Sequence, residues 1–264
     1  MTKPHLDYID KLKKERRMVI FFQIFIILFI LFLWDLFAYL NIIDTFIFSS
    51  PNVIFKLMVK YLKTNELLNH TLVSSYEVVI GLILGTVLGL LIAILLYEFP
   101  KVAKILDPYL IVINALPKTA LAPIIIIWIG ANIKGIIFVT ISISLIITII
   151  NALNAFNNVD KEKIKLLKTF NASRVQILRY LIIPSNIEEI LNIIKINIGM
   201  SWIGVIVGEF IVSKEGLGYL ITYGTQVFRL DLVMLGIITL AFVTMLMYGI
   251  LNLVVKTYLK YRGW

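Results

Sequence analysis

Hydrophobic residues of this chain are gathered into six long segments that short polar stretches separate. Each segment is long enough to cross the hydrocarbon core of a bilayer as a helix, which takes about 20 apolar residues. The pattern predicts an all-α integral membrane protein with six transmembrane helices. The six segments are Met18–Leu40, Thr71–Tyr97, Tyr109–Gly130, Gly135–Phe156, Ile187–Ile211 and Leu232–Val255.

The first segment follows a basic stretch, Lys11 to Arg17, which is similar to the start of a signal peptide. Its apolar run is longer than the roughly 7–15 residues of a signal peptide, and no small-residue cleavage site follows it. We therefore expect this segment to be retained as a membrane span. Residues 1–17 are expected to form a cytoplasmic tail, and residues 18–264 a single transmembrane domain.

Composition and charge agree with this class. The chain is 60% hydrophobic and 16% charged, with a mean hydropathy of +0.95, whereas soluble domains average about 45–50% apolar and 25% charged residues. It has no Cys and two His, which excludes disulfides, thiolate metal sites and a His cluster. The basic residues are spread over the polar stretches, so they suit anionic lipid headgroups better than nucleic acid.

Catalytic and nucleotide-binding motifs are missing from the sequence. It contains no Gly-x-x-x-x-Gly-Lys-Ser/Thr loop, no Gly-x-Ser-x-Gly elbow and no His-Glu motif. We therefore expect that the chain is not an enzyme and binds no cofactor or metal. If the chain does work that needs ATP, another subunit must supply the energy.

Lys and Arg residues are unequally shared between the two sides of the six spans. Most of the 25 lie in the N-terminal stretch, in Lys101–Lys104, in Lys161–Arg179 and after Val255, which all fall on one side. Cytoplasmic loops carry the excess of basic residues. The count therefore predicts a multi-pass protein of the cell membrane with both termini in the cytoplasm.

A polar interruption from Asp160 to Arg179 separates the fourth and fifth segments. Asp160 can cap a first helix, on which Ile164, Leu167 and Phe170 share a face opposite three lysines. Such a basic amphipathic hairpin either lies on the lipid surface or docks a protein partner.

The hairpin also contains signals for a turn and for a second helix. Asn171 tolerates the left-handed conformation that ends helices, and Ser173 followed by Gln176 is a capping-box pattern. Pro184 then marks a boundary before the fifth span.

This stretch resembles the cytoplasmic loop of bacterial ABC-importer permeases. In that loop a Glu-Ala-Ala triplet is followed four residues later by Gly, then by Ala-Ser, and thirteen residues after the Gly by Pro. Here Asn171 stands at the Gly, Ala172-Ser173 match, and Pro184 has the expected spacing, while residues 165–167 depart from the triplet.

Other segments resemble one branch of that family, the permeases for nitrate, taurine, alkanesulfonates and thiamine precursors. The segments are Trp34-Asp35, Ser50-Pro51, the stretch 116–123 running into Trp128-Ile129-Gly130, the stretch 201–205, Glu209, and the stretch 216–220. The resemblance covers nearly the whole chain after its first 30 or so residues.

The resemblance implies a type I ABC-importer permease fold with cytoplasmic coupling helices in the loop at 157–183. It implies a homodimer, two copies of an ABC ATPase that bind ATP and Mg, and an extracellular solute-binding protein. The substrate is expected to be a small organic anion such as a sulfonate, or a thiamine-precursor-like compound. The coupling residues are expected to be Lys165, Leu167, Phe170, Asn171, Ala172, Ser173 and Arg174.

Glycines at helical spacing predict close packing between spans. Gly81, Gly85 and Gly89 recur every fourth residue in the second segment, and Gly204 and Gly208 do so in the fifth. Such stripes let another helix approach closely.

Four residues are candidates for a translocation path: Pro117, Lys118, Trp202 and Glu209. A charged group such as Lys118 within an apolar segment either faces a cavity or snorkels to the headgroups. Glu209 either meets a partner outside the cell or caps the outer loop.

Two other classes of function remain open on the sequence. A secondary transporter or channel would need inverted repeats and intramembrane ionisable pairs, which are not evident. A membrane scaffold would tolerate the loss of Lys118, so solute uptake by a Lys118→Ala strain separates it from a transporter.

Overall fold

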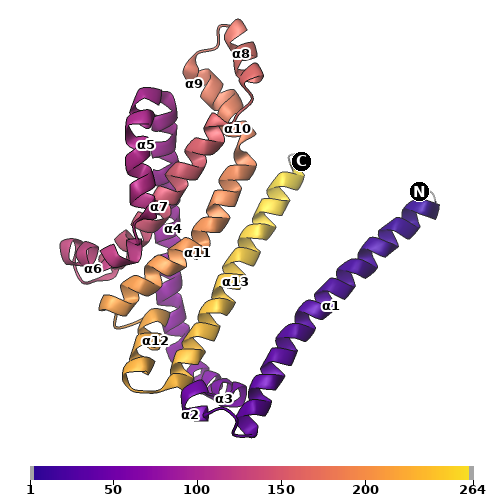
Figure 1. The fold of residues 1–264 in the computed structure, drawn as a ribbon, viewed down its shortest axis with the longest axis vertical. Helices are drawn as coiled ribbons and strands as arrows, with labels where there is room; N and C mark the ends of the chain where they lie inside the picture. Colours follow the sequence, from indigo (N-terminus) through magenta and orange to yellow (C-terminus); the bar gives the residue numbers. More distant parts are fainter. Residues whose placement is uncertain (1–2, 262–264) are drawn as a thin grey trace.

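The computed structural model describes residues 3–261, and every regular element in that range is helical. Figure 1 shows long helices side by side, with short helices at both ends. The elements are α1 (Lys3–Tyr39), α2 (Thr45–Phe48), α3 (Pro51–Lys63), α4 (Glu66–Glu98), α5 (Pro100–Ala115), α6 (Lys118–Ile129), α7 (Ile133–Asn157), α8 (Lys161–Thr169), α9 (Arg174–Ile177), the π-helix η1 (Leu178–Ile182), α10 (Ile183–Ser185), α11 (Ile187–Val212), α12 (Leu217–Gln226) and α13 (Leu230–Tyr261).

Three of the long helices, α4, α7 and α11, form the centre of the bundle. Glycines of α4 lie against small hydroxyl-bearing residues of α7, in the pairs Gly81 with Thr140, Gly85 with Ser144 and Gly89 with Thr148. The residue numbers of the two helices increase in the same direction along this row of contacts, so α4 and α7 run parallel. On α11, Gly204 lies against Thr140 and Gly208 against Ile136, so α11 runs antiparallel to α7.

The third apolar segment, expected to be one span over Tyr109–Gly130, differs from the prediction. It is divided between α5 and α6, whose axes are bent by 96°. Leu116 is extended and Pro117 follows it, because proline disfavours helical geometry in the preceding residue and supplies no backbone N–H. Within the described residues, five helices can each span a membrane, and α5 with α6 makes a sixth span if the bent pair is counted as one.

The first helix stands apart from the bundle. The most apolar stretch of α1 has no buried residue, and Figure 1 shows α1 meeting the other helices only near α2 and α3. The helix begins at Lys3 and passes the expected boundary at residue 18 without a break. Its side chains from Met18 onward are exposed almost throughout, as suits contact with lipid or another chain.

Polar side chains mark where several helices start. Ser50 Oγ accepts a hydrogen bond from Val53 N at 3.4 Å at the start of α3, and Asn132 Oδ1 accepts one from Lys134 N at 2.9 Å at the start of α7. These caps satisfy N–H groups that have no partner within the helix.

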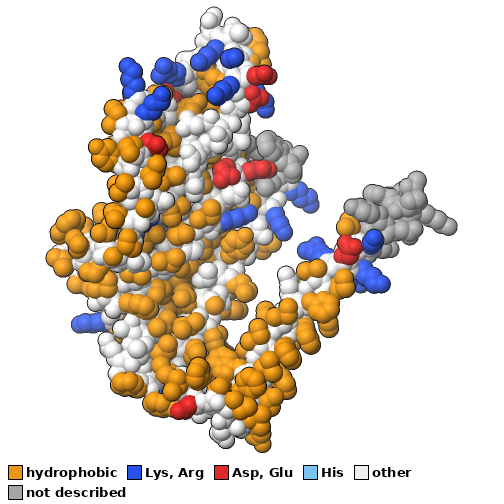
Figure 2. All heavy atoms as spheres, in the orientation of Figure 1, with side chains coloured by type: hydrophobic (Ala, Val, Ile, Leu, Met, Phe, Trp, Pro, Cys, Tyr) orange, Lys and Arg blue, Asp and Glu red, His pale blue; other side chains and the backbone are white. Residues whose placement is uncertain are grey.

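The two ends of the molecule differ in charge. The start of α1, the end of α13 and the α8–α9 hairpin lie toward one end, and α2, α3 and α12 lie at the other (Figure 1). Figure 2 shows Lys and Arg side chains gathered around α8 and α9, while hydrophobic side chains cover the middle of the molecule. The charged hairpin, the start of α1 and the end of α13 are therefore on the same side of the apolar band.

We predict that Gly85→Val destabilises the bundle by about 1–3 kcal/mol, because the added side chain overlaps the Ser144 side chain. The loss is measured as a lower midpoint of thermal unfolding in detergent. Gly199→Val is the matched control, because nothing lies within 4 Å of a Cβ built at Gly199. Equal midpoints for the two variants would contradict the packing seam.

Candidate functional site

The polar hairpin between α7 and α11 is built from two short capped helices. Asp160 Oδ1 accepts a hydrogen bond from Glu162 N at 2.8 Å, which starts α8. Asn171 follows the helix with φ 56°, in the left-handed region. Ser173 and Gln176 then form a capping box, in which Ser173 N donates to Gln176 Oε1 at 2.7 Å and Gln176 N donates to Ser173 Oγ at 3.3 Å. The turn is thus defined by local bonds on both sides.

The inner side of the hairpin packs against the ends of α4 and α7. Ile164, Leu167 and Ala172 are half-buried against a core cluster that contains Ala93 of α4 and Phe156 of α7. Arg174 Nη1 also donates a hydrogen bond of 3.5 Å to the backbone carbonyl oxygen of Glu98. Leu167 and Ala172, expected among the coupling residues, therefore help to attach the hairpin to the bundle.

The outer side of the hairpin exposes large apolar residues. Leu166 is 58% exposed, Phe170 74% and Val175 65%. The expectation that Phe170 shares a face with Ile164 and Leu167 is wrong, because α8 ends at Thr169 and the chain turns at Phe170. Lys165, Asn171, Ser173 and Arg174 are exposed around it.

The fifth span begins at Ile187 as expected, but the break that precedes it lies at Asn186 and not at Pro184. Pro184 lies within the short α10, and the helical path breaks at Asn186, where α11 begins one residue later. Asn186 Nδ2 donates to the carbonyl oxygen of Ile182 at 2.8 Å. The π-helix η1 precedes this break, as is common where a helix accommodates an interruption.

The four candidates for a translocation path lie in two different environments. Pro117 and Lys118 are at the bend between α5 and α6, and Lys118 Nζ donates to the backbone oxygen and Oδ1 of Asn114, both at 3.2 Å. Trp202 and Glu209 are 4% and 1% exposed in the core of the bundle. In this conformation neither of the last two faces an open space.

Glu209 caps α12 from a neighbouring helix. Its Oε2 accepts a hydrogen bond from Gly218 N at 2.5 Å, and its Oε1 accepts one from Ser74 Oγ at 2.6 Å. Ser74 Oγ in turn accepts from Leu217 N at 2.7 Å. Gly216 has φ 104°, and a Cβ there would overlap the Glu209 carboxylate. Glu209 therefore takes the loop-capping role that the sequence left as one of two alternatives.

Two buried polar groups were missed by the sequence analysis. Asn197 Nδ2 donates to Thr86 Oγ1 at 2.8 Å and to Thr148 Oγ1 at 2.7 Å, which joins α11, α4 and α7. Glu77 is 1% exposed beside Glu209. The sequence did contain a signal for both, because a polar residue inside an apolar segment usually faces the interior of a helix bundle.

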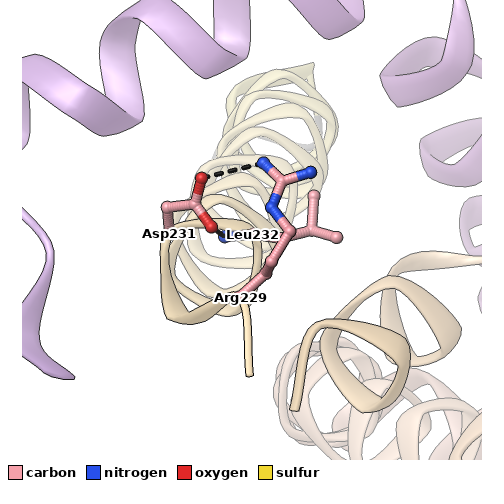
Figure 3. Close-up of polar contacts among 3 residues, drawn as sticks. All are labelled: Arg229, Asp231 and Leu232. Carbon is pink, nitrogen blue, oxygen red and sulfur yellow. Dashed lines mark hydrogen bonds and ion pairs between the residues drawn. The ribbon is translucent and has the colours of Figure 1, made fainter. Parts of the chain in front are cut away.

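A charged pair fixes the start of α13 at the end of the molecule that carries α12. Figure 3 shows Arg229 Nη2 donating to Asp231 Oδ2 at 2.8 Å, while Asp231 Oδ1 accepts from Leu232 N at 2.9 Å. The hydrogen bond to Asp231 raises the pKa of Arg229. The preceding residue, Phe228, has φ 55° and is 73% exposed.

These features define a class of protein: a multi-pass helical membrane protein that presents a rigid hairpin at the charged end of its bundle. Residues 85–261 match the family described as the binding-protein-dependent transport system inner membrane component, and the chain belongs to this family. It is thus a permease component of an ABC importer.

Similar proteins agree with this assignment. A putative aliphatic sulfonates transport permease protein of Bacillus subtilis is 27% identical, over 89% of this chain and 85% of its own. A formylaminopyrimidine transport permease protein of Halalkalibacterium halodurans is 31% identical, over 53% of this chain and 56% of its own. The fold is similar to a chain of the inward-facing MetNI methionine ABC transporter, with a TM-score of 0.58 and 16% identity, covering 72% of this chain and 97% of that one.

We predict that Asn171→Val loosens the hairpin, because an L-residue in the left-handed region costs about 1–2 kcal/mol and Val has no side-chain amide to offset this. Trypsin should cleave the lysine-rich α8 faster in this variant. Asn171→Gly is the control, since Gly adopts positive φ freely. If the Val variant resists trypsin as well as the Gly variant does, the turn does not depend on this residue.

Proposed function

We propose that this chain works as a homodimer whose two copies line one translocation path, with two ATPase subunits bound on the cytoplasmic side. A solute-binding protein delivers the solute from outside. ATP and Mg bind to the ATPase subunits, which hydrolyse the ATP. The observation that carries the proposal is Phe170, 74% exposed at the turn between two capped helices. A large apolar side chain held in this way suits an apolar groove on a partner.

The attachment of the hairpin supports its role in coupling. Leu167 and Ala172 pack on the bundle while Phe170 points away from it. A displacement of the outer side is therefore passed to the ends of α4 and α7. Rigid-body rocking of the paired bundles follows from such a displacement, as in other domain movements.

The hairpin and both chain termini are assigned to the cytoplasm. The basic side chains around α8 and α9 (Figure 2) support this orientation through the positive-inside rule. On this assignment α12 and the loop at 213–216 face the outside.

Orientation can be tested directly because the chain has no Cys. Lys168 and Lys214 are both exposed, one on α8 and one just after α11. We predict that a membrane-impermeant maleimide added to intact spheroplasts labels the Lys214→Cys variant and leaves Lys168→Cys unlabelled until the cells are opened. The reverse pattern would overturn the orientation.

The solute is proposed to be a small organic compound, either a sulfonate-like anion or a thiamine-precursor-like pyrimidine. Relatives named for aliphatic sulfonates and for formylaminopyrimidine support both. Lys118 at the α5–α6 bend is the basic residue proposed for the path, together with Pro117, and it is partly exposed. The positive charge of Lys118 at this bend favours the sulfonate-like anion as the solute.

We predict that Phe170→Asp abolishes co-purification of the ATPase subunit in detergent, because a charge is then buried in an apolar groove without a partner. Phe228→Asp is the matched control, since Phe228 is 73% exposed at the opposite end of the molecule. It should retain the ATPase.

Retention of the ATPase by Phe170→Asp would remove this residue from the docking surface. If the native chain binds no cellular ATPase at all, transport driven without ATP becomes the better account.

A further inference from the structure

Two carboxyl groups are buried together at the end of the bundle that carries α12. Glu77 of α4 and Glu209 of α11 are each 1% exposed, and their carboxyl groups are neighbours. A buried acidic pair in a membrane bundle is costly and calls for a chemical explanation.

Glu209 acts as an acceptor in every other contact it makes. Its oxygens receive Ser74 O–H and Gly218 N–H. The Gly218 amide belongs to the first turn of α12, where the helix dipole also favours a negative charge. An ionised carboxylate fits this setting, because it only accepts hydrogen bonds.

Glu77 has the opposite surroundings. No donor reaches its Oε2, which is buried without a hydrogen-bond partner. Two ionised carboxylates are both acceptors, so a hydrogen bond between them requires one proton. Two adjacent negative charges on side chains that are each 1% exposed are also strongly unfavourable.

The neighbouring charged groups of the described chain form no ion pair with either carboxyl group. His70 of α4 accepts a hydrogen bond from Gly216 N through Nδ1 at 3.0 Å, and its ring lies tilted against that of Tyr219 of α12, with 5.8 Å between the ring centroids. Glu66 in the first turn of α4 and Glu215 of the loop are the acidic residues near His70. Lys214 and Glu215 of the loop line a cavity together with Glu77, and Lys134 lies at the start of α7. Among the side chains described, no Lys or Arg forms an ion pair with Glu77 or Glu209.

We propose that Glu77 is a proton-binding site: it stays a neutral carboxylic acid and donates its proton to the Glu209 carboxylate. The acid–carboxylate pair then fastens the start of α12 to α4 and α11. The site lies away from the coupling hairpin, so it stands independently of the solute and of the ATPase. If Glu77 lost its proton, two negative charges would lie side by side next to the loop at 213–216. Their repulsion would release the start of α12 from α4 and α11.

Infrared spectroscopy of the purified full chain tests the proton directly. A protonated carboxyl group has a carbonyl stretch that a carboxylate lacks. At neutral pH the native chain should show this band, Glu77→Gln should lose it, and Glu189→Gln, which changes an exposed acid of α11, should keep it. A native chain without the band, or a band that survives Glu77→Gln, overturns the proposal.

Thermal unfolding in detergent tests which partner holds the proton. A Gln amide can still donate, so Glu77→Gln should unfold close to the native midpoint. Glu209→Gln should unfold at a clearly lower temperature, because an amide cannot accept from all the groups that surround Glu209. Equal losses in the two variants, or a larger loss in Glu77→Gln, would contradict the assignment.

Discussion

Close packing of α4, α7 and α11 is the contact on which the rest of the structure depends. Lipid tails are as apolar as Leu, so helices in a membrane gain little from burying large apolar side chains against each other. They associate where backbones approach closely, and the Gly85–Ser144 contact and its neighbours allow this approach. Asn197 adds hydrogen bonds to Thr86 and Thr148 inside the same seam. A shift of one helix along another would break both kinds of contact.

Both ends of the molecule are attached to these three helices. At one end the hairpin rests on the cluster that includes Ala93 and Phe156. At the other, Ser74 and Glu209 hold the start of α12. Because the seam between the ends is closely packed, the two attachments belong to one rigid unit, and a force on the hairpin reaches the opposite end of the bundle.

Some of this arrangement could be predicted from the sequence and some could not. Apolar length located the spans, and the Asn171 turn with the Ser173 capping box follows from residues close in sequence. The side of the hairpin on which Phe170 lies depends on where α8 stops. The contact between Glu77 and Glu209 joins two spans far apart in sequence, and a single sequence does not encode which faces meet. Pro117 was visible, but its place inside a long apolar run hid a bend of 96°.

The parts that are free to move follow from the same distribution of contacts. The hairpin is capped on both sides of Asn171 and fastened through Arg174, so it does not act as a hinge itself. The close contacts of α4 and α11 with α7 do not allow these helices to slide along one another. The bend at Leu116 and Pro117 is where a span changes direction, with Lys118 bonded back to Asn114 across it. Ala122 and Ile126 of α6 are buried against α7, so α6 itself is held by the bundle. Motion transmitted from the hairpin is therefore taken up at the exposed bend residue Leu116 and in the contacts of α1, whose apolar stretch has no buried residue.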